Sequence, residues 1–231
     1  MQDPMTTLTD MEQSSLDAIV TVVETDVHRA LLSGTTVIGM EYKSPHFRFQ
    51  AVFAAMALMQ VVSFLEPRPE RALCLGLGAG TAPHFFRASG IHTDVIEYDA
   101  AVINLASRHF VFGADHRSFT AGGRVIHADA IQSIEEGRPH GDPPYDLVLS
   151  DLWSGGNQGA ALQLSYFEKI RSSWLTPNGT FALNVVGFPA GPHASFVERV
   201  VRTMRAVFSH VHTFLEFDPH KPGGFEAASS E

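Results

Sequence analysis

The sequence predicts an α/β fold with a mostly parallel central sheet flanked by helices, preceded by a small N-terminal extension with a β-hairpin and a helix. Short apolar segments such as "ALCLGLG", "YDLVLSD" and "GTFALNVVG" alternate with helix-length segments, which is the pattern of βα units. Leu147, Val148 and Leu149 are apolar in succession, as expected when helices cover both faces of a sheet. A chain of 231 residues that is 45% hydrophobic can build one sizeable core.

The individual elements follow from these patterns. Two β-branched runs joined at Ser33-Gly34 predict a hairpin within residues 1–45, and the apolar segment after it predicts a helix over 46–65. We expect strands near 72–76, 93–98, 124–127, 145–150, 179–186 and 210–217. Helices are expected over 81–89, 100–110, 129–136, 165–175 and 193–208. Residues 46–217 would form the main domain, and 218–231 a flexible tail.

Composition excludes several functional classes. The net charge of −9 argues against nucleic acid as a partner, because nucleic-acid-binding proteins usually present a basic face. The longest apolar stretch is interrupted by Gln60 and is too short for a membrane span, and the N-terminus does not have the pattern of a signal peptide. Cys74 is the only cysteine, which fits a reducing compartment. We therefore expect a cytoplasmic protein with no membrane partner.

The stretch "RALCLGLGAGTAPHFF" suggests a binding turn. It contains Gly76, Gly78 and Gly80 at alternate positions, where an apolar strand gives way to a helix. Three glycines so close together indicate positive φ angles or close approach to another group. In α/β sheets, ligands bind beyond the carboxyl ends of the strands.

Two acids stand at the ends of the next two strands. Glu97 follows the glycines by about 20 residues, where a carboxylate can accept hydrogen bonds from both ribose hydroxyls. Asp129 ends the third strand, where it could accept an adenine amino proton or cap the following helix. Together with the glycines, these acids predict a nucleoside site.

The segments "LCLGLGAGT", "VIEYDAAVINLASRHF", "VIHADA" and "YDLVLSD" resemble the class I S-adenosylmethionine-dependent transferases, and within them the spermidine-synthase-like branch, which includes methyltransferases. The resemblance covers roughly residues 46–215. It implies a Rossmann-like fold in which 46–217 is the catalytic domain, with S-adenosyl-L-methionine as the cofactor. By this likeness the cofactor site comprises Gly76, Gly78, Ala79, Gly80, Glu97, Tyr98, Asp129, Ala130 and Asp151.

Departures from the branch favour methyl transfer. Spermidine synthases carry an Asp in the glycine turn that pairs with the amine of decarboxylated S-adenosylmethionine, and Ala79 stands there in this chain. Losing that carboxylate removes repulsion against an intact methionine carboxylate. Of the branch's two acids after strand four, Asp151 remains and Ser154 replaces the other. The resemblance and these departures imply methyl transfer to a small amine or amino-acid-like acceptor.

Asp151 is the candidate catalytic residue, because a carboxylate there could orient or deprotonate the acceptor. Trp153 could stack on a cationic acceptor, and Phe49 and Gln50 correspond to the acceptor-contacting Tyr-His-Glu region of the branch. The "GGNQG" loop at 155–159 could close over the substrate or be a simple connection.

Alternatives remain open. An aminopropyltransferase, another S-adenosylmethionine-consuming alkyl transfer or cyclisation, and a non-catalytic nucleoside-binding module all fit the same residues. A nicotinamide enzyme is disfavoured, since Thr81 stands where the third glycine of G-x-G-x-x-G is expected. His210 and His212 lack an evident third ligand, so we expect no metal.

The sequence predicts an open edge of the central sheet that a second subunit could cover. After "HTFLEF" the chain has too little β-prone sequence for the reversed seventh strand usual in class I methyltransferases. The N-terminal segment or a second subunit could cover the resulting edge. We therefore expect a homodimer that acts on a small-molecule acceptor.

Overall fold

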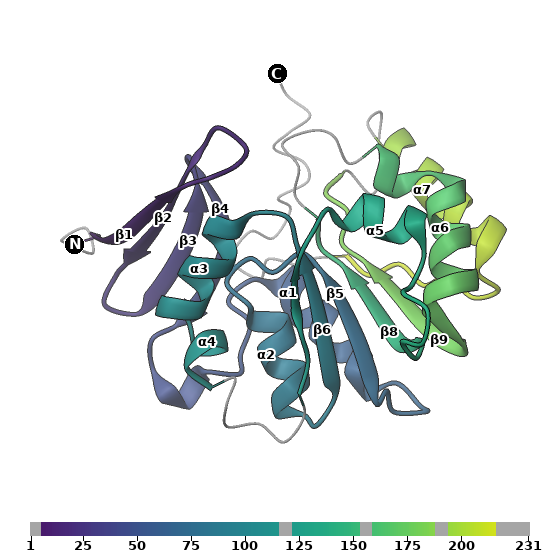
Figure 1. The fold of residues 1–231 in the computed structure, drawn as a ribbon, viewed down its shortest axis with the longest axis horizontal. Helices are drawn as coiled ribbons and strands as arrows, with labels where there is room; N and C mark the ends of the chain where they lie inside the picture. The colour runs from purple at the N-terminus through teal and green to yellow at the C-terminus, as the bar shows by residue number, and fades with distance from the viewer. Residues whose placement is uncertain (1–5, 116–121, 153–158, 188–193, 216–231) are drawn as a thin grey trace.

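A computed structural model describes residues 6–115, 122–152, 159–187 and 194–215 of the chain. In this part, two sheets lie side by side: a four-stranded sheet near the N-terminus and a five-stranded central sheet (Figure 1). None of the helices that the structure describes is both long enough and apolar enough to cross a membrane.

The central sheet is parallel throughout, as the sequence predicts. Its strands run in the order β7-β6-β5-β8-β9. They are β5 (Arg71–Leu75), β6 (His92–Glu97), β7 (Val125–His127), β8 (Tyr145–Ser150) and β9 (Leu175–Leu183). The chain order therefore reverses at β5, between β6 and β8, and in α/β folds a ligand crevice forms at such a reversal.

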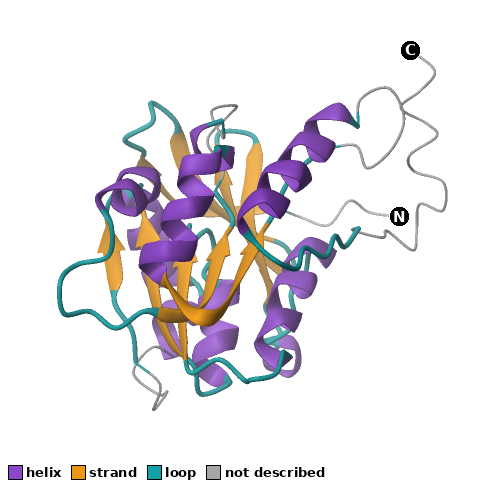
Figure 2. Cartoon of the chain, turned by 90° about the vertical axis from the view of Figure 1, so that its right-hand side faces the viewer, coloured by secondary structure: helices purple, strands orange, loops and turns teal. Residues whose placement is uncertain are grey.

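Helices cover both faces of this sheet (Figure 2). Ala72 and Cys74 of β5 face one core, which includes α2 and α3, whereas Leu73 and Leu75 face the other, which includes α5, α6 and α7. This alternation explains the unbroken apolar strands, because successive side chains enter opposite layers. The helices are α1 (Ala54–Val61), α2 (Thr81–Ala88), α3 (Ala100–His109), α4 (Val111–Asp115), α5 (Ala130–Glu136), α6 (Leu164–Lys169) and α7 (Ser195–Val207). Short helical turns lie at Pro45–Phe47, Val62–Phe64 and Ala160–Leu162, and a π-helix at Ile170–Trp174.

Two of the helices begin at acidic caps. The Asp99 carboxylate accepts a hydrogen bond from the amide of Ala101 at 3.0 Å and caps α3. The Asp129 carboxylate accepts bonds from Ile131 and Gln132 and caps α5. Such caps satisfy amides that the first helical turn leaves unpaired.

The N-terminal extension is larger than a hairpin. It is an antiparallel sheet of four strands in sequential order: β1 (Thr7–Gln13), β2 (Ile19–Glu24), β3 (His28–Ser33) and β4 (Thr36–Tyr42). The expected turn at Ser33-Gly34 is present, with Ser33 paired to Thr36. Buried Val20, Val22 and Leu31 share the core that includes α3, so one face of this sheet packs against the main domain.

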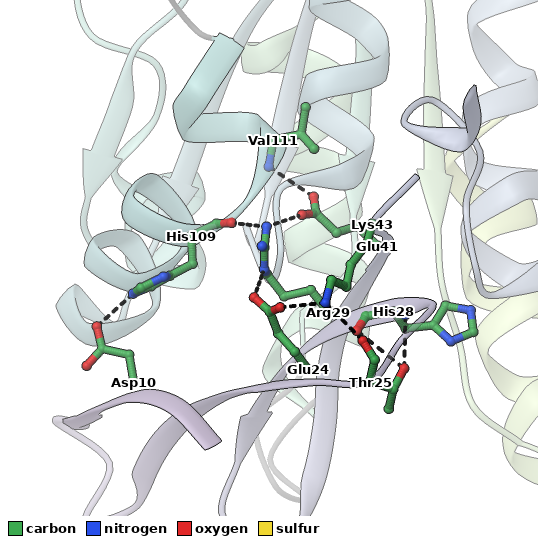
Figure 3. Close-up of polar contacts among 9 residues, drawn as sticks. All are labelled: Asp10, Glu24, Thr25, His28, Arg29, Glu41, Lys43, His109 and Val111. Carbon is green, nitrogen blue, oxygen red and sulfur yellow. Dashed lines mark hydrogen bonds and ion pairs between the residues drawn. The ribbon is translucent and has the colours of Figure 1, made fainter. Parts of the chain in front are cut away.

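Ionic contacts anchor the N-terminal sheet to the corner between α3 and α4 (Figure 3). Arg29 bonds Glu24 at 2.7 Å and Glu41 at 3.0 Å, and it also donates to the carbonyl of His109. The Glu41 carboxylate accepts from the amide of Val111 at 3.0 Å. Glu41 is buried, and burial raises its pKa even though Arg29 and the Val111 amide oppose the shift.

Two expectations about the elements are wrong. The apolar segment 46–65 is not one helix, because α1 begins only at Ala54 and the chain is extended at Phe53. No strand forms over 208–215, although residues 216 and 217 lie outside the described part. Phe214 is 72% exposed, so this segment lacks the partner that would turn an apolar pattern into a strand.

Candidate functional site

Backbone hydrogen bonds align the carboxyl ends of four parallel strands at one edge of the sheet. The Gly76 amide donates to Ile96 at 2.9 Å, and the Asp151 amide donates to Leu75 at 3.0 Å. The amide of Asn184 donates to Ser150 at 2.9 Å. The residues that follow β5, β8 and β9 therefore meet at one edge of the sheet, beside Glu97 at the end of β6.

A cavity of about 630 Å³ lies at this edge, a volume typical of small-molecule sites. Its floor is formed by the glycine turn and the strand ends. Further lining residues come from the N-terminal sheet, such as Ile38 and Met40, and from the segment leading into α1, such as Val52 and Phe53. Of the predicted site residues, the cavity is lined by Gly76, Gly78, Ala79, Glu97, Tyr98, Asp129, Ala130 and Asp151.

The three glycines all have positive φ, of 93°, 53° and 78° in chain order. A Cβ on Gly76 would lie 2.6 Å from the carbonyl oxygen of Asp151, and one on Gly78 would lie 2.5 Å from that of Ile38. Gly80 caps α2 rather than lining the cavity, and a Cβ there would meet the Phe112 side chain at 2.5 Å. The glycines are thus needed to fit neighbouring parts of the protein, and only the first two also border the cavity.

Glu97 is held by the backbone on both of its oxygens. Oε2 accepts from the Leu77 amide at 2.8 Å, and Oε1 accepts from the Asp99 amide at 2.8 Å. Burial raises the pKa of Glu97, and these two hydrogen bonds partly offset the shift. A carboxylate oxygen can accept more than one hydrogen bond, so each oxygen keeps capacity for a hydroxyl in the cavity.

Asp129 lies between β7 and α5, where it caps the helix and also lines the cavity. Its Oδ1 accepts from the Ile131 amide at 2.7 Å and from the Gln132 amide at 3.1 Å. Because both caps use the same oxygen, Oδ2 can serve a ligand. Tyr98, which is 45% exposed, lies between Glu97 and Asp99 along the same wall.

Asp151 pairs with a residue that the sequence reasoning did not identify. Its Oδ1 accepts from the side-chain amide of Asn184 at 2.9 Å. Burial raises the pKa of Asp151, and the hydrogen bond from Asn184 opposes the shift. A carboxyl in this setting can act as a proton acceptor at a pH near neutrality more readily than a fully exposed one.

The charged side chains that line the described cavity are all acidic: Glu97, Asp99, Asp129 and Asp151. Lys, Arg and His are absent from its lining among the described residues. A concave surface with one sign of charge concentrates ligands of the opposite sign. The site therefore favours a ligand with a positive centre, such as a sulfonium or an ammonium group.

Phe49 and Gln50 do not line the cavity. Phe49 stacks on the ring of His84, with centroids 5.2 Å apart, and is 42% exposed. Trp153, Ser154 and the "GGNQG" loop up to residue 158 lie outside the described residues. In the described chain, no group of three His, Cys, Asp or Glu side chains has the geometry of a metal site.

Asn184 and Phe53 are two of the cavity residues that sequence reasoning missed, and signals for both exist. Asn184 follows β9 as Asp151 follows β8, but the predicted strand 179–186 placed Asn184 inside the strand. Phe53 stands four residues after Phe49, in the same aromatic run. A strand end placed at 183 and an extended segment before α1 would have identified them.

Known proteins resemble this chain over most of its length. The chain matches no protein-family model. It is 26% identical over 209 residues to a polyamine aminopropyltransferase of Vibrio vulnificus, covering 88% of this chain and 66% of that protein. It is 30% identical over 178 residues to an eEF1A lysine and N-terminal methyltransferase of Bos taurus, covering 69% of this chain and 23% of that protein.

Two solved structures extend the comparison. Spermidine synthase from Thermotoga maritima superposes with a TM-score of 0.65 at 16% identity, covering 88% of this chain and 65% of that one. Human methyltransferase-like protein 13 in complex with SAH gives a TM-score of 0.50 at 26% identity, covering 69% and 72%. The chain thus spans about two thirds of the aminopropyltransferase (66%) and a much smaller share, 23%, of the bovine methyltransferase.

Proposed function

Because the chain has the class I S-adenosylmethionine-dependent methyltransferase fold of the spermidine-synthase-like branch, we propose that it is an S-adenosylmethionine-dependent transferase. Its favoured reaction is methyl transfer to a small amine or amino-acid-like nucleophile. The observation that carries the proposal is the convergence of Glu97, Asp129 and Asp151 on one cavity above the glycine turn.

Named residues would hold the donor. Glu97 is fixed by two backbone amides and would accept hydrogen bonds from the ribose hydroxyls. Asp129 would accept a hydrogen bond from the adenine amino group through Oδ2, the oxygen that does not cap α5. The acidic lining suits a positively charged sulfur. When bound, S-adenosylmethionine supplies a methyl group on that sulfur, which makes the methyl carbon electrophilic.

Asp151 would act on the acceptor. Its carboxylate would hold an ammonium group near the methyl carbon and take one of its protons, which frees the nitrogen lone pair to bond to that carbon as the carbon–sulfur bond breaks and the sulfur becomes a neutral thioether. Fixing donor and acceptor in line is the main catalytic task in a displacement of this kind. General-base assistance typically adds about 10²- to 10⁴-fold to the rate.

Methyl transfer is favoured by the surroundings of Ala79. Its side chain is 2% exposed, and β4 passes so close that a Cβ on Gly39 would lie 2.6 Å from the Ala79 Cβ. Because residue 79 is Ala, the glycine turn carries no carboxylate to pair with the amine of a decarboxylated donor, and the close approach of β4 leaves little room for a longer side chain there.

Aminopropyl transfer is the second candidate. The similarity to the Vibrio vulnificus aminopropyltransferase covers 88% of this chain, and the all-acidic cavity also suits a polyamine. Another alkyl transfer, a cyclisation, and nucleoside binding without turnover are further outcomes that the experiment below separates. The bovine relative is named for lysine and N-terminal methylation, so peptide amines belong among the acceptors tested.

The test combines calorimetry with product mass. The protein is titrated with S-adenosylmethionine, its decarboxylated form and NAD, and then incubated with small amines, free amino acids and peptides with a free N-terminus. We expect tightest binding of the intact donor and a product heavier by one methyl group. Preference for the decarboxylated form with an aminopropyl product would establish the second candidate, and binding without any product would support a non-catalytic module.

Asp151→Asn tests the catalytic assignment. It should lower turnover by about 10²-fold or more while changing donor affinity by less than about threefold, because the carboxylate acts on the acceptor. Asp26→Asn, an exposed acid in the turn between β2 and β3, is the matched control. Equal turnover in the two variants would remove Asp151 from the mechanism.

A further inference from the structure

Asn184 occupies a defined place relative to Asp151. Leu183 of β9 pairs with Ser150 of β8, so the residues that follow them stand side by side. The Asn184 amide continues this ladder by donating to the Ser150 carbonyl at 2.9 Å. Its side chain then donates through Nδ2 to Oδ1 of Asp151, also at 2.9 Å. Both side chains line the cavity.

Resting on the proposed function, we propose that Asn184 is a positioning residue, which fixes the Asp151 carboxylate through Oδ1 so that Oδ2 meets the acceptor. A carboxylate at the end of a strand can rotate about two side-chain bonds, and a hydrogen bond from a backbone-anchored neighbour removes that freedom. Misplacing a reacting group by about 1 Å can cost about 10²-fold in rate.

The chemistry of an amide suits this role. A neutral donor stabilises the ionised carboxylate without cancelling its charge, whereas Lys or Arg in the same place would form an ion pair and compete with a cationic acceptor. An added cation would also repel a positively charged donor. The amide of Asn184 therefore supports Asp151 and leaves the cavity acidic.

The titratable groups around Asp151 come from several elements. Burial raises the pKa of Cys74 to about 12, so its thiol is neutral. Burial raises the pKa of Asp151, and the hydrogen bond from Asn184 opposes that shift. The titratable groups that line the cavity together with Asp151 are Glu97, Tyr98, Asp99 and Asp129, and Cys74 on β5 is close enough for the Asp151 carboxylate to contribute to its raised pKa.

Asn184→Leu removes the donor while it keeps the branched shape of the side chain, and its first readout is independent of turnover. Carboxyl carbon NMR, with the Asp151 signal assigned from Asp151→Asn, follows the titration of Asp151 in the ligand-free protein. We expect the pKa of Asp151 to rise by the order of one unit when the hydrogen bond is lost. Asn178→Leu, the same change at an exposed position on β9, should leave it unmoved.

Turnover gives the second readout. In Asn184→Leu we expect kcat to fall about tenfold or more at neutral pH, with the acidic limb of its pH profile moved upward and donor affinity changed less than about threefold. Asn184→Gln keeps an amide donor and should recover part of kcat. A merely structural role would lower thermal stability without moving the pH profile.

The outcomes separate the two proposals. If the wild-type protein converts no donor, the proposed transferase function fails, while the titration still decides whether Asn184 holds Asp151. If Asp151 titrates alike in wild type and Asn184→Leu, or if the kcat profile is unmoved, the positioning role is overturned. A well-folded Asn178→Leu that shifts the titration equally would also overturn it.

Discussion

At the scale of single residues, the glycine turn is shaped by contact with the protein's own backbone. Gly78 meets the carbonyl of Ile38, and Gly39 meets the backbone of Ala79, where an added Cβ would lie 2.3 Å from the amide nitrogen. Both contacts join β4 to the turn. The turn therefore needs glycine even before any ligand binds.

The cost of a side chain in the turn is testable with two glycines of similar conformation. Gly78 has φ 53° and Gly34 has φ 59°, but a Cβ on Gly34 would have nothing within 4 Å. Gly34→Ala should lose only the conformational term, about 1 kcal/mol. Gly78→Ala should lose about 1–3 kcal/mol more, because β4 must move, and it should weaken donor binding. Urea unfolding and calorimetry measure both effects, and equal losses in the two variants would contradict the contact.

The residues that could be predicted from the sequence are those fixed by strand ends. Glu97 and Asp129 follow strands with clear apolar runs, so the general rule for parallel sheets placed them in one cavity. Asn184 escaped the same rule because β9 ends earlier than its apolar pattern. Phe49 and Gln50 were assigned from a family motif, and their side chains depend on packing that the sequence does not encode locally.

At the scale of elements, an apolar pattern in the sequence predicted the right element where the packing around that segment buries its apolar residues. Strand β8 has the predicted bounds 145–150, because its apolar run is buried by helices on both faces. The segment 46–65 is equally apolar, but Val52 and Phe53 line the cavity, and the helix begins only after them, at Ala54. The hydrophobic periodicity and the composition of a segment do not show that some of its residues must line a cavity instead of joining a helix.

The Arg29–Glu41 contact is an element-scale clamp, since it ties β3 and β4 to the start of α4. The raised pKa of Glu41 means that the folded protein keeps its proton at a pH where the unfolded chain has lost it. The stabilisation from this group is present below the ordinary Glu pKa and is lost as the pH rises through the folded value.

Glu41→Gln should therefore change the pH dependence of unfolding. Gln is neutral throughout and can still accept from Val111, so wild type should lose stability relative to Glu41→Gln as the pH rises above the ordinary Glu pKa. Urea unfolding at several pH values measures the difference. Glu135→Gln, an exposed acid on α5, should stay within about 0.5 kcal/mol of wild type. A constant gap between wild type and Glu41→Gln would refute the prediction.

At the scale of the whole molecule, the two ends of the central sheet differ. The N-terminal sheet packs beside α3, on the β7 side, whereas β9 lies at the opposite edge (Figure 1). The N-terminal segment is one of two candidates to cover the open edge, but its sheet packs against α3 and does not cover β9. Residues 208–215 form no strand beside β9.

A second subunit remains the proposed cover for this edge. We expect sedimentation equilibrium to give twice the chain mass of 25.2 kDa, because the nine-residue β9 is an edge strand of the sheet that the structure describes, and edge strands favour pairing. Introducing Lys at Thr180, within β9, should shift the equilibrium toward single chains if the edge forms the contact. A single-chain mass for the wild-type protein would exclude the dimer.

The passage of β4 against the glycine turn has a consequence for engineering. Two backbones that touch without intervening side chains cannot be exchanged one at a time, so a chimera that grafts another protein's N-terminal sheet must carry a residue without a side chain at position 39. Recombination between distant homologues should consequently tolerate crossovers after α2 far better than crossovers between residues 42 and 76, which would separate β4 from the glycine turn.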